Sequence, residues 1–501
     1  MRMRWSTAVA VAIVVAATLA TDAATANPST RSSAAVGVAA AGGARPAIAW
    51  TDCADVPTVK CGSIRVPLDW SRPHGATIKI AFARRRATGP GPSLGPLFVN
   101  PGGPGASGLQ LALGADQALP PALLQRFDIV GVDPRGVGSS TPVRCAGDVF
   151  PPGYTLFPDD DAEYQGMLRQ NRALGASCLR GTGALLGHLD TQSAARDHDA
   201  VRAALGADKL SWLGLSYGTE LGETYARLFP KRVRAMVLDG NLDHSLTMVP
   251  WLADTITATE DGLVRFARWC DTSTECVLHG QPVLRIFDQV VARADRHPVA
   301  VPGASRPVTG EDVRLNVNNL LLLKQPAPLF GGGWPAAAQA LAKARDGDLS
   351  DFATSAQTGP TDELYAQLAI ECMDYDPQLR GFADLHDRMT MGRQLAPHLQ
   401  GAGQGWTVNA QCAGWPVRPA FPPKPVRVRG TVRILVVNAT HDPSTPYVWA
   451  QGVASEIDNH ALLTRVGDGH TSTLTSPCVR DRITRYLLSA TVPRVVPDCV
   501  E

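Results

Sequence analysis

The chain has 501 residues, of which 45% are hydrophobic and 19% are charged, and its formal net charge at pH 7 is +1. This length and apolar content allow one large domain with an insertion, or two to three ordinary domains. The nearly neutral charge gives no electrostatic basis for a nucleic-acid partner, so we expect none.

The first 26 residues have the pattern of a secretory signal peptide. Arg2 and Arg4 give a positive start, residues 8–19 are apolar, and Ala24-Thr25-Ala26 forms a small-residue cleavage site. The alternative is an uncleaved anchor helix, but the apolar run is short for a membrane span. We therefore expect a mature chain that begins at Asn27, opens with a flexible leader over 27–48, and has no stable membrane insertion.

All ten cysteines follow this signal, and an even number in an exported chain predicts disulfide bonds. No CxxC pair or histidine cluster indicates a metal site, and we expect neither a metal nor an organic cofactor. The connectivity does not follow from the sequence, and the simplest hypothesis pairs neighbours along the chain. The pairs are then Cys53–Cys61, Cys145–Cys178, Cys270–Cys276, Cys372–Cys412 and Cys478–Cys499.

The first half of the mature chain, residues 49–240, alternates short apolar segments with helical patterns. Strands are predicted at 97–99, 127–132, 210–215 and 233–238, and helices at 191–205 and 219–229. Short apolar strands separated by helices are typical of a parallel sheet that is buried on both faces. We therefore predict an α/β fold with a mostly parallel central sheet and helices on both faces.

The pattern changes at residues 241–428, where helical stretches such as 252–269 and 364–373 alternate with loops rich in proline and glycine. The parallel pattern returns at 429–501, with strands at 432–437 and near 462–466. A last helix opens at Ser476-Pro477, which supplies a cap and a proline at the first position. One sheet domain, formed by 49–240 and 429–501, is thus expected to be interrupted by a mostly helical insertion.

Gly214-Leu215-Ser216-Tyr217-Gly218 lies between a predicted strand and a predicted helix. A G-x-S-x-G at such a junction is a nucleophile elbow, because the sharp turn needs small residues on both sides and raises the serine above the sheet edge. The helix N-terminus below the serine also favours developing negative charge. The alternative is an ordinary turn, but this context favours Ser216 as a nucleophile.

A serine nucleophile needs a base and an orienting carboxylate, which follow it in the order Ser, Asp or Glu, His in this fold. Asp442 lies where the strand at 432–437 leads into a loop. Of the two histidines downstream, His460 precedes the next strand, at the wrong end of the sheet, whereas His470 follows that strand in a glycine-rich loop. We therefore predict the triad Ser216, Asp442 and His470, and treat His441 as structural.

The oxyanion hole is expected to use the backbone N–H of Tyr217, the residue after the nucleophile. The second donor comes from a loop after an early strand, and the glycine-rich segment at 100–105 fits that place. Within it, Gly103 is the predicted donor.

Taken together, these segments resemble the prolyl and tripeptidyl aminopeptidase family of serine peptidases within the α/β-hydrolases, from about residue 50 to the C-terminus. The segments that carry the resemblance are Asn100-Pro-Gly-Gly-Pro-Gly, Asp133-Pro-Arg-Gly-Val-Gly-Ser-Ser, Gly214-Leu-Ser-Tyr-Gly-Thr, Val237-Leu-Asp-Gly, Asp442-Pro-Ser-Thr-Pro and Gly469-His-Thr-Ser. Prolyl aminopeptidases usually open the oxyanion loop with histidine, so Asn100 favours the tripeptidyl branch, whose secreted actinobacterial members the C-terminal segments resemble. The resemblance implies an α/β-hydrolase fold, release of short peptides from free N-termini, and an insertion that acts as a lid.

An enzyme of this kind has to bind the ammonium group of its peptide or small-protein substrate. Glu371 and Asp374 in the insertion, which share a helix face at i, i+3 spacing, are candidates for this role. The alternative for both is a solvated helix face beside a disulfide. Thr445 is expected either to support the loop of Asp442 or to line the pocket.

The sequence thus predicts a secreted or cell-envelope serine hydrolase, most directly an aminopeptidase that releases tripeptides. A secreted carboxylesterase or lipase with the same triad is the first alternative, because the fold does not choose between amides and esters. A catalytically silent binding protein of the cell envelope is the second. The residue preference, the length of the released peptide and the oligomeric state do not follow from the sequence.

Overall fold

The computed structural model describes residues 47–53, 56–327, 330–353 and 362–501, and within them ten strands form one sheet. The strand order is β1-β2-β3-β5-β4-β6-β7-β8-β9-β10. The predicted signal peptide and the predicted leader up to residue 46 lie outside the described residues. Strands β1 (Ala49–Asp52), β2 (Val59–Pro67) and β3 (Thr77–Arg85) are antiparallel to their neighbours, and every pairing from β5 (Asp128–Val132) to β10 (Cys499–Val500) is parallel. The predicted mostly parallel sheet is confirmed, with an antiparallel edge that the sequence pattern did not reveal.

The central strands are β4 (Pro96–Asn100), β6 (Leu210–Leu215), β7 (Val233–Asp239), β8 (Ile434–His441) and β9 (His460–Asp468). All six residues of β6 are buried, because both faces of the sheet are covered and successive side chains point to opposite faces. Trp212 packs into the hydrophobic cluster on one face of the sheet, and Leu213 packs into the cluster on the opposite face.

Helices cover both faces of this sheet, as expected. One face packs against α1 (Gly108–Leu113), α3 (Pro121–Arg126) and α17 (Pro477–Ser489). The other packs against α5 (Thr191–Ala204), α6 (Tyr217–Leu228) and α15 (Tyr447–Glu456). Ser476 caps α17 by accepting from the N–H of Val479, as its sequence predicted.

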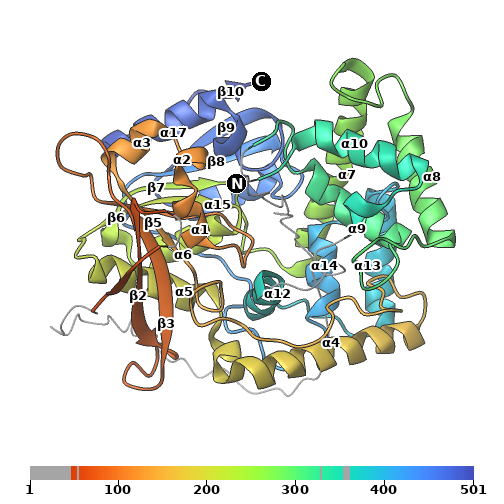
Figure 1. Ribbon diagram of the computed structural model, residues 1–501, viewed down its shortest axis with the longest axis horizontal. Helices are drawn as coiled ribbons and strands as arrows, with labels where there is room; N and C mark the ends of the chain where they lie inside the picture. Colours follow the sequence, from red (N-terminus) through yellow and green to blue (C-terminus); the bar gives the residue numbers. More distant parts are fainter. Residues whose placement is uncertain (1–46, 54–55, 328–329, 354–361) are drawn as a thin grey trace, which may run out of the picture.

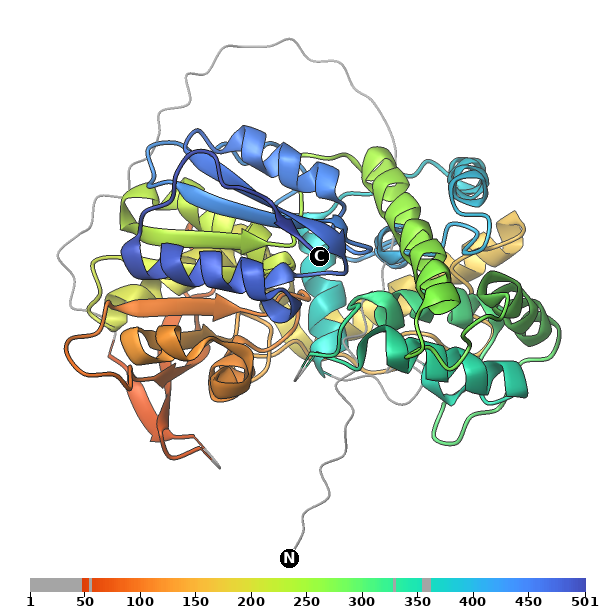
Figure 2. The ribbon, with the colours of Figure 1, turned by 90° about the horizontal axis from the view of Figure 1, so that it is seen from above.

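The helical insertion lies to one side of the sheet, on the right in both views of Figures 1 and 2. It contains α7 (Met248–Thr272), α8 (Val283–Arg296), α9 (Gly310–Leu321), α10 (Gly333–Asp346), α12 (Asp362–Asp374), α13 (Phe382–Leu395) and α14 (Gln404–Gln411). The long helix α4 (Asp161–Thr182) precedes residue 241 but packs with this layer, where Asn171 Nδ2 donates to the carbonyl oxygen of Ala410 at 2.7 Å. None of the helices in the described ranges has the length and hydropathy that a membrane span requires.

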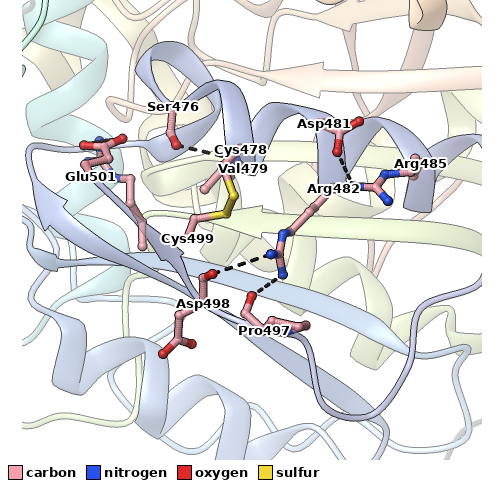
Figure 3. Close-up of a disulfide and its surroundings, with 11 residues drawn as sticks. Ser476, Cys478, Val479, Asp481, Arg482, Arg485, Pro497, Asp498, Cys499 and Glu501 are labelled. Carbon is pink, nitrogen blue, oxygen red and sulfur yellow. Dashed lines mark hydrogen bonds and ion pairs between the residues drawn. A yellow bond between two sulfur atoms is a disulfide. The ribbon is translucent and has the colours of Figure 1, made fainter.

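The ten cysteines form five disulfides, in the neighbour pairing stated above. At the C-terminus, Cys478–Cys499 ties β10 to α17, as Figure 3 shows. Arg482 of α17 also donates to the carbonyl oxygens of Pro497 and Asp498 on the incoming segment. The last strand is therefore held to the domain by a covalent bond and by side-chain hydrogen bonds.

Candidate active site

Ser216 lies at a sharp turn between β6 and α6. Its backbone has φ 55° and ψ −126°, in the left-handed range that a non-glycine residue rarely adopts, and its N–H donates to the carbonyl oxygen of Asp239 at 3.0 Å. A Cβ added at Gly214 would lie 2.1 Å from the carbonyl oxygen of Gly218, so the first glycine of the motif is required for the close crossing of strand and helix. The helix begins at Tyr217, two residues before the predicted start, with Ser216 at its N-cap.

Asp442 follows the last residue of β8 and faces His470. Its two oxygens lie 3.0 and 2.8 Å from His470 Nδ1. They also accept hydrogen bonds from Ser444 N–H and from Thr445 N–H and Oγ1, at 2.8–2.9 Å. Because the carboxylate accepts a hydrogen bond from Nδ1–H, the lone pair of the neutral imidazole is on Nε2, which is the form that a general base requires. Nε2 is buried and has no partner among the described residues.

The glycine-rich loop after β4 lies directly against the elbow. Asn100 Oδ1 accepts from Gly102 N–H at 2.9 Å, and a Cβ at Gly102 would lie 2.7 Å from Ser216 Cβ. The Gly102 amide is thus already paired, whereas Gly103 and Tyr217 line the same cavity as Ser216. The backbone N–H groups of Gly103 and Tyr217 remain the predicted donors to an oxyanion.

The cavity at Ser216 encloses about 30 Å³ and lies between the sheet edge and the insertion. This volume holds one or two waters. Its polar walls include Glu371 and Tyr375 of the segment at α12, Gln404 of α14, and Thr445, which therefore both supports Asp442 and lines the cavity. The lining residues are Gly103, Pro104, Ser216, Tyr217, Leu242, Trp251, Glu371, Tyr375, Gln404, Val408, Ser444, Thr445 and Trp449.

Glu371 is buried in the wall of this cavity. Its Oε1 accepts from Gln367 Nε2 at 3.1 Å, and its Oε2 has no partner in the part of the chain that the structure describes. Burial, with a smaller contribution from the charge of Glu220, raises the pKa of Glu371 to about 8. An unpaired buried carboxyl group beside the elbow is suited to a cationic group on a ligand.

Asp374, the other acidic candidate, does not line the cavity. Its carboxylate accepts from the N–H and the hydroxyl of Thr191 at 2.9 and 2.7 Å, and Thr191 Oγ1 in turn bonds to the Tyr217 hydroxyl. Burial raises the pKa of Asp374, and the charges of Glu220 and Asp190 raise it further. Asp374 is therefore connected to Tyr217 through Thr191, whereas Glu371 of the same helix lines the cavity.

Asp239, at the end of β7, is a site residue that was not predicted, because the order Ser, Asp, His along the chain does not identify it. Its carboxylate accepts from Ser472 N–H at 3.0 Å and from Thr473 N–H at 2.6 Å, while its carbonyl oxygen accepts from Ser216. Asp239 thus connects the turn of the nucleophile to the loop that follows His470. Asp239 lies in the Val237-Leu-Asp-Gly segment, and this segment is the sequence feature that could have identified it as a site residue.

Two sets of polar contacts join the insertion to the segments next to Asp442 and His470. His441 Nδ1 lies 2.8 Å from Asp261 of α7, so His441 takes no part in the triad geometry. Asp468 forms ion pairs with Arg265 of α7 and with Lys324. Within the described residues, no grouping of His, Cys, Asp and Glu side chains is suited to a metal ion.

Sequence comparisons identify a family and, over most of the chain, several relatives. Residues 398–499 match the family model described as TAP-like protein. The chain is 33% identical to the serine protease Hip1 of Mycobacterium tuberculosis, over 89% of each chain. It is 31% identical to the tripeptidyl aminopeptidase of Streptomyces coelicolor, over 90% of this chain and 86% of that one. It is also 32% identical to carboxylesterase B of M. tuberculosis, over 88% and 86%.

Proposed function

The chain belongs to the TAP-like family of α/β-hydrolase serine hydrolases, and from this premise we propose that it is an exported aminopeptidase that releases tripeptides from free N-termini. Five disulfides are consistent with export, because they persist in oxidising compartments. Two of its relatives are named as a serine protease and a tripeptidyl aminopeptidase, which supports a peptide substrate.

The proposed reaction uses Ser216, His470 and Asp442. Ser216 Oγ attacks the scissile carbonyl carbon while His470 Nε2 takes its proton, and Asp442 stabilises the imidazolium through Nδ1. The N–H groups of Tyr217 and Gly103 stabilise the oxyanion. The imidazolium then gives its proton to the leaving amine, and water hydrolyses the peptidyl ester by the same route.

Glu371 is the observation that carries the aminopeptidase assignment. Its unpaired oxygen lies in the wall of the cavity that also holds Ser216, and an ammonium group there would complete a charge-assisted hydrogen bond. An acetylated N-terminus has no charge to offer and would leave the carboxyl group unpaired. A free N-terminus is therefore the expected recognition element.

The test compares the mature protein with Ser216→Ala on three substrates. These are a tripeptide amide with a free N-terminus, its acetylated twin and a short-chain ester. Turnover of the free tripeptide that is lost in the variant supports the proposal. Ester turnover without peptide cleavage would instead favour the carboxylesterase activity after which one relative is named. Failure of a covalent serine probe to label Ser216 would favour a binding protein without catalysis.

A further inference from the structure

Two side chains of the cavity at Ser216 carry N–H groups that belong neither to the triad nor to the oxyanion hole. Trp251 Nε1 and Gln404 Nε2 are both buried and have no acceptor among the residues that the structure describes. A buried N–H without an acceptor is energetically unfavourable and rare in native proteins. Each group is therefore expected to be satisfied by what the cavity binds.

The neighbours of both groups fix their orientation. The Trp251 indole stacks on Trp449 at 5.3 Å between ring centroids and contacts Tyr375 at the same distance, so the ring is held on two sides. Gln404 Oε1 accepts from Ser444 Oγ at 2.6 Å, which turns Nε2 away from the loop of Asp442. Both donors are thus held in orientation by neighbouring side chains of the cavity wall.

We propose that Trp251 and Gln404 bind the two non-scissile carbonyl oxygens of an N-terminal tripeptide and thereby select tripeptides over single residues. This inference rests on the proposed function. A tripeptidyl group has one ammonium and three carbonyls, and the scissile carbonyl occupies the oxyanion hole. The two remaining carbonyls need two donors, and the ammonium needs one acceptor, for which Glu371 Oε2 is available. A single aminoacyl group has no carbonyl for either Trp251 or Gln404.

Trp449 provides a matched control within the same wall. Its indole Nε1 already donates to Asp254 at 2.9 Å, so it has no free N–H for a substrate. Trp449→Phe and Trp251→Phe reduce two stacked rings by the same atoms, but the first breaks the hydrogen bond to Asp254, whereas only the second removes an unpaired donor. Gln404→Met removes the other donor at nearly constant side-chain length.

The experiment measures kcat/KM for alanyl and trialanyl p-nitroanilides with free N-termini, and the quantity of interest is the ratio of the trialanyl to the alanyl value. Trp251→Phe and Gln404→Met are each expected to lower this ratio about tenfold, the factor carried by about 1.4 kcal/mol. Trp449→Phe is expected to keep the ratio. Hydrolysis of p-nitrophenyl acetate shows whether each variant is folded. If only one of the two donor variants folds, that variant alone tests the proposal.

The proposal is overturned by an unchanged ratio in a folded donor variant, or by an equal fall in Trp449→Phe, which would assign the effect to ring packing. A wild-type enzyme that hydrolyses the ester but neither anilide would refute the proposed function instead. The two failures are therefore distinguishable in one set of assays.

Discussion

The main-chain N–H of His470 donates to the carbonyl oxygen of Leu322 at 2.6 Å, so the proposed base is hydrogen-bonded directly to the helical insertion. Gly469 lies against the same segment, where an added Cβ would be 3.1 Å from Lys324 N and 3.2 Å from Leu322 O. The insertion therefore does more than cover the cavity. It also sets the position of the loop that presents the imidazole.

Asp468→Asn tests this coupling. Asp468 is buried between Arg265 and Lys324, whose side chains are 28% and 31% exposed, and these cations lower its pKa although burial alone would raise it. Loss of both ion pairs should lower the free energy of unfolding by about 1–2 kcal/mol, less than for a fully buried pair. It should also lower kcat more than it changes KM, because the base rather than the substrate contacts is displaced. Urea unfolding and steady-state kinetics measure the two effects.

Asp481→Asn is the control for this variant. Asp481 pairs with Arg485 on α17, where both side chains are largely exposed, so its loss should change stability by less than about 0.5 kcal/mol. Asp468→Glu should restore part of kcat. Equal kcat values for Asp468→Asn and the wild type would contradict the coupling.

Gly102→Ala should lower kcat by about a hundredfold or more. The glycine has φ +99°, and its added Cβ would lie 2.7 Å from both Leu215 O and Ser216 Cβ, so the oxyanion loop has to move away from the elbow. Displacing one oxyanion donor costs about a hundredfold or more in kcat. Gly91→Ala is matched in backbone, with φ +88°, but its Cβ meets nothing within 4 Å. Similar activities of the two variants would argue against the close packing of loop and elbow.

The pH dependence of substrate selection follows from Glu371. Because the pKa of this carboxyl group is raised to about 8, it is protonated at lower pH and gains its charge as the pH rises through that value. The α-amino group of a peptide loses its charge above about 7.7–8.0. The ratio of kcat/KM for a free tripeptide to that for its acetylated twin should therefore peak near pH 8. A ratio that rises steadily toward pH 5 would contradict a role for Glu371.

The disulfide Cys372–Cys412 should matter for substrate binding as well as for stability. It joins α12, which carries Glu371, to the end of α14, which carries Gln404. Replacing both cysteines by serine should lower stability by about 3–4 kcal/mol and raise KM for the tripeptide. The Cys145–Cys178 pair has a similar sequence separation, 33 against 40, and joins two segments that do not line the cavity, so its removal should lower stability with little change in KM. A matching rise in KM for both double variants would contradict this distinction.

The sequence predicted the sheet, the elbow and the positions of Asp442 and His470 because each depends on local patterns. Strand 210–215 is observed with those bounds, since a short, mostly apolar run is typical of a buried parallel strand. Other elements left weaker signals. Helix α4 is largely polar, and its buried residues are divided between the neighbouring segment 183–188 and the distant α14, so its sequence alone did not predict it. β8 extends to His441, four residues beyond the predicted end, because its backbone stays paired with β9 as far as His441 and Asp468.

The walls of the cavity were the least predictable part. Trp251, Tyr375 and Gln404 come from three elements of the insertion and meet only through tertiary packing. The i, i+3 spacing of Glu371 and Asp374 suggested a shared role, but Thr191 at the start of α5 engages only Asp374. Spacing within one helix does not reveal which neighbour each side chain will contact.

One measurement tests the central claim most directly: kcat/KM for a trialanyl p-nitroanilide with a free N-terminus, relative to its acetylated twin, at pH 8. The wild-type enzyme should prefer the free substrate by about a hundredfold, as expected for a buried charge-assisted hydrogen bond. Glu371→Gln should remove most of this preference, and Asp374→Asn, which changes a buried acid of the same helix outside the cavity, should retain it. Equal cleavage of the free and acetylated substrates by the wild type would contradict the account.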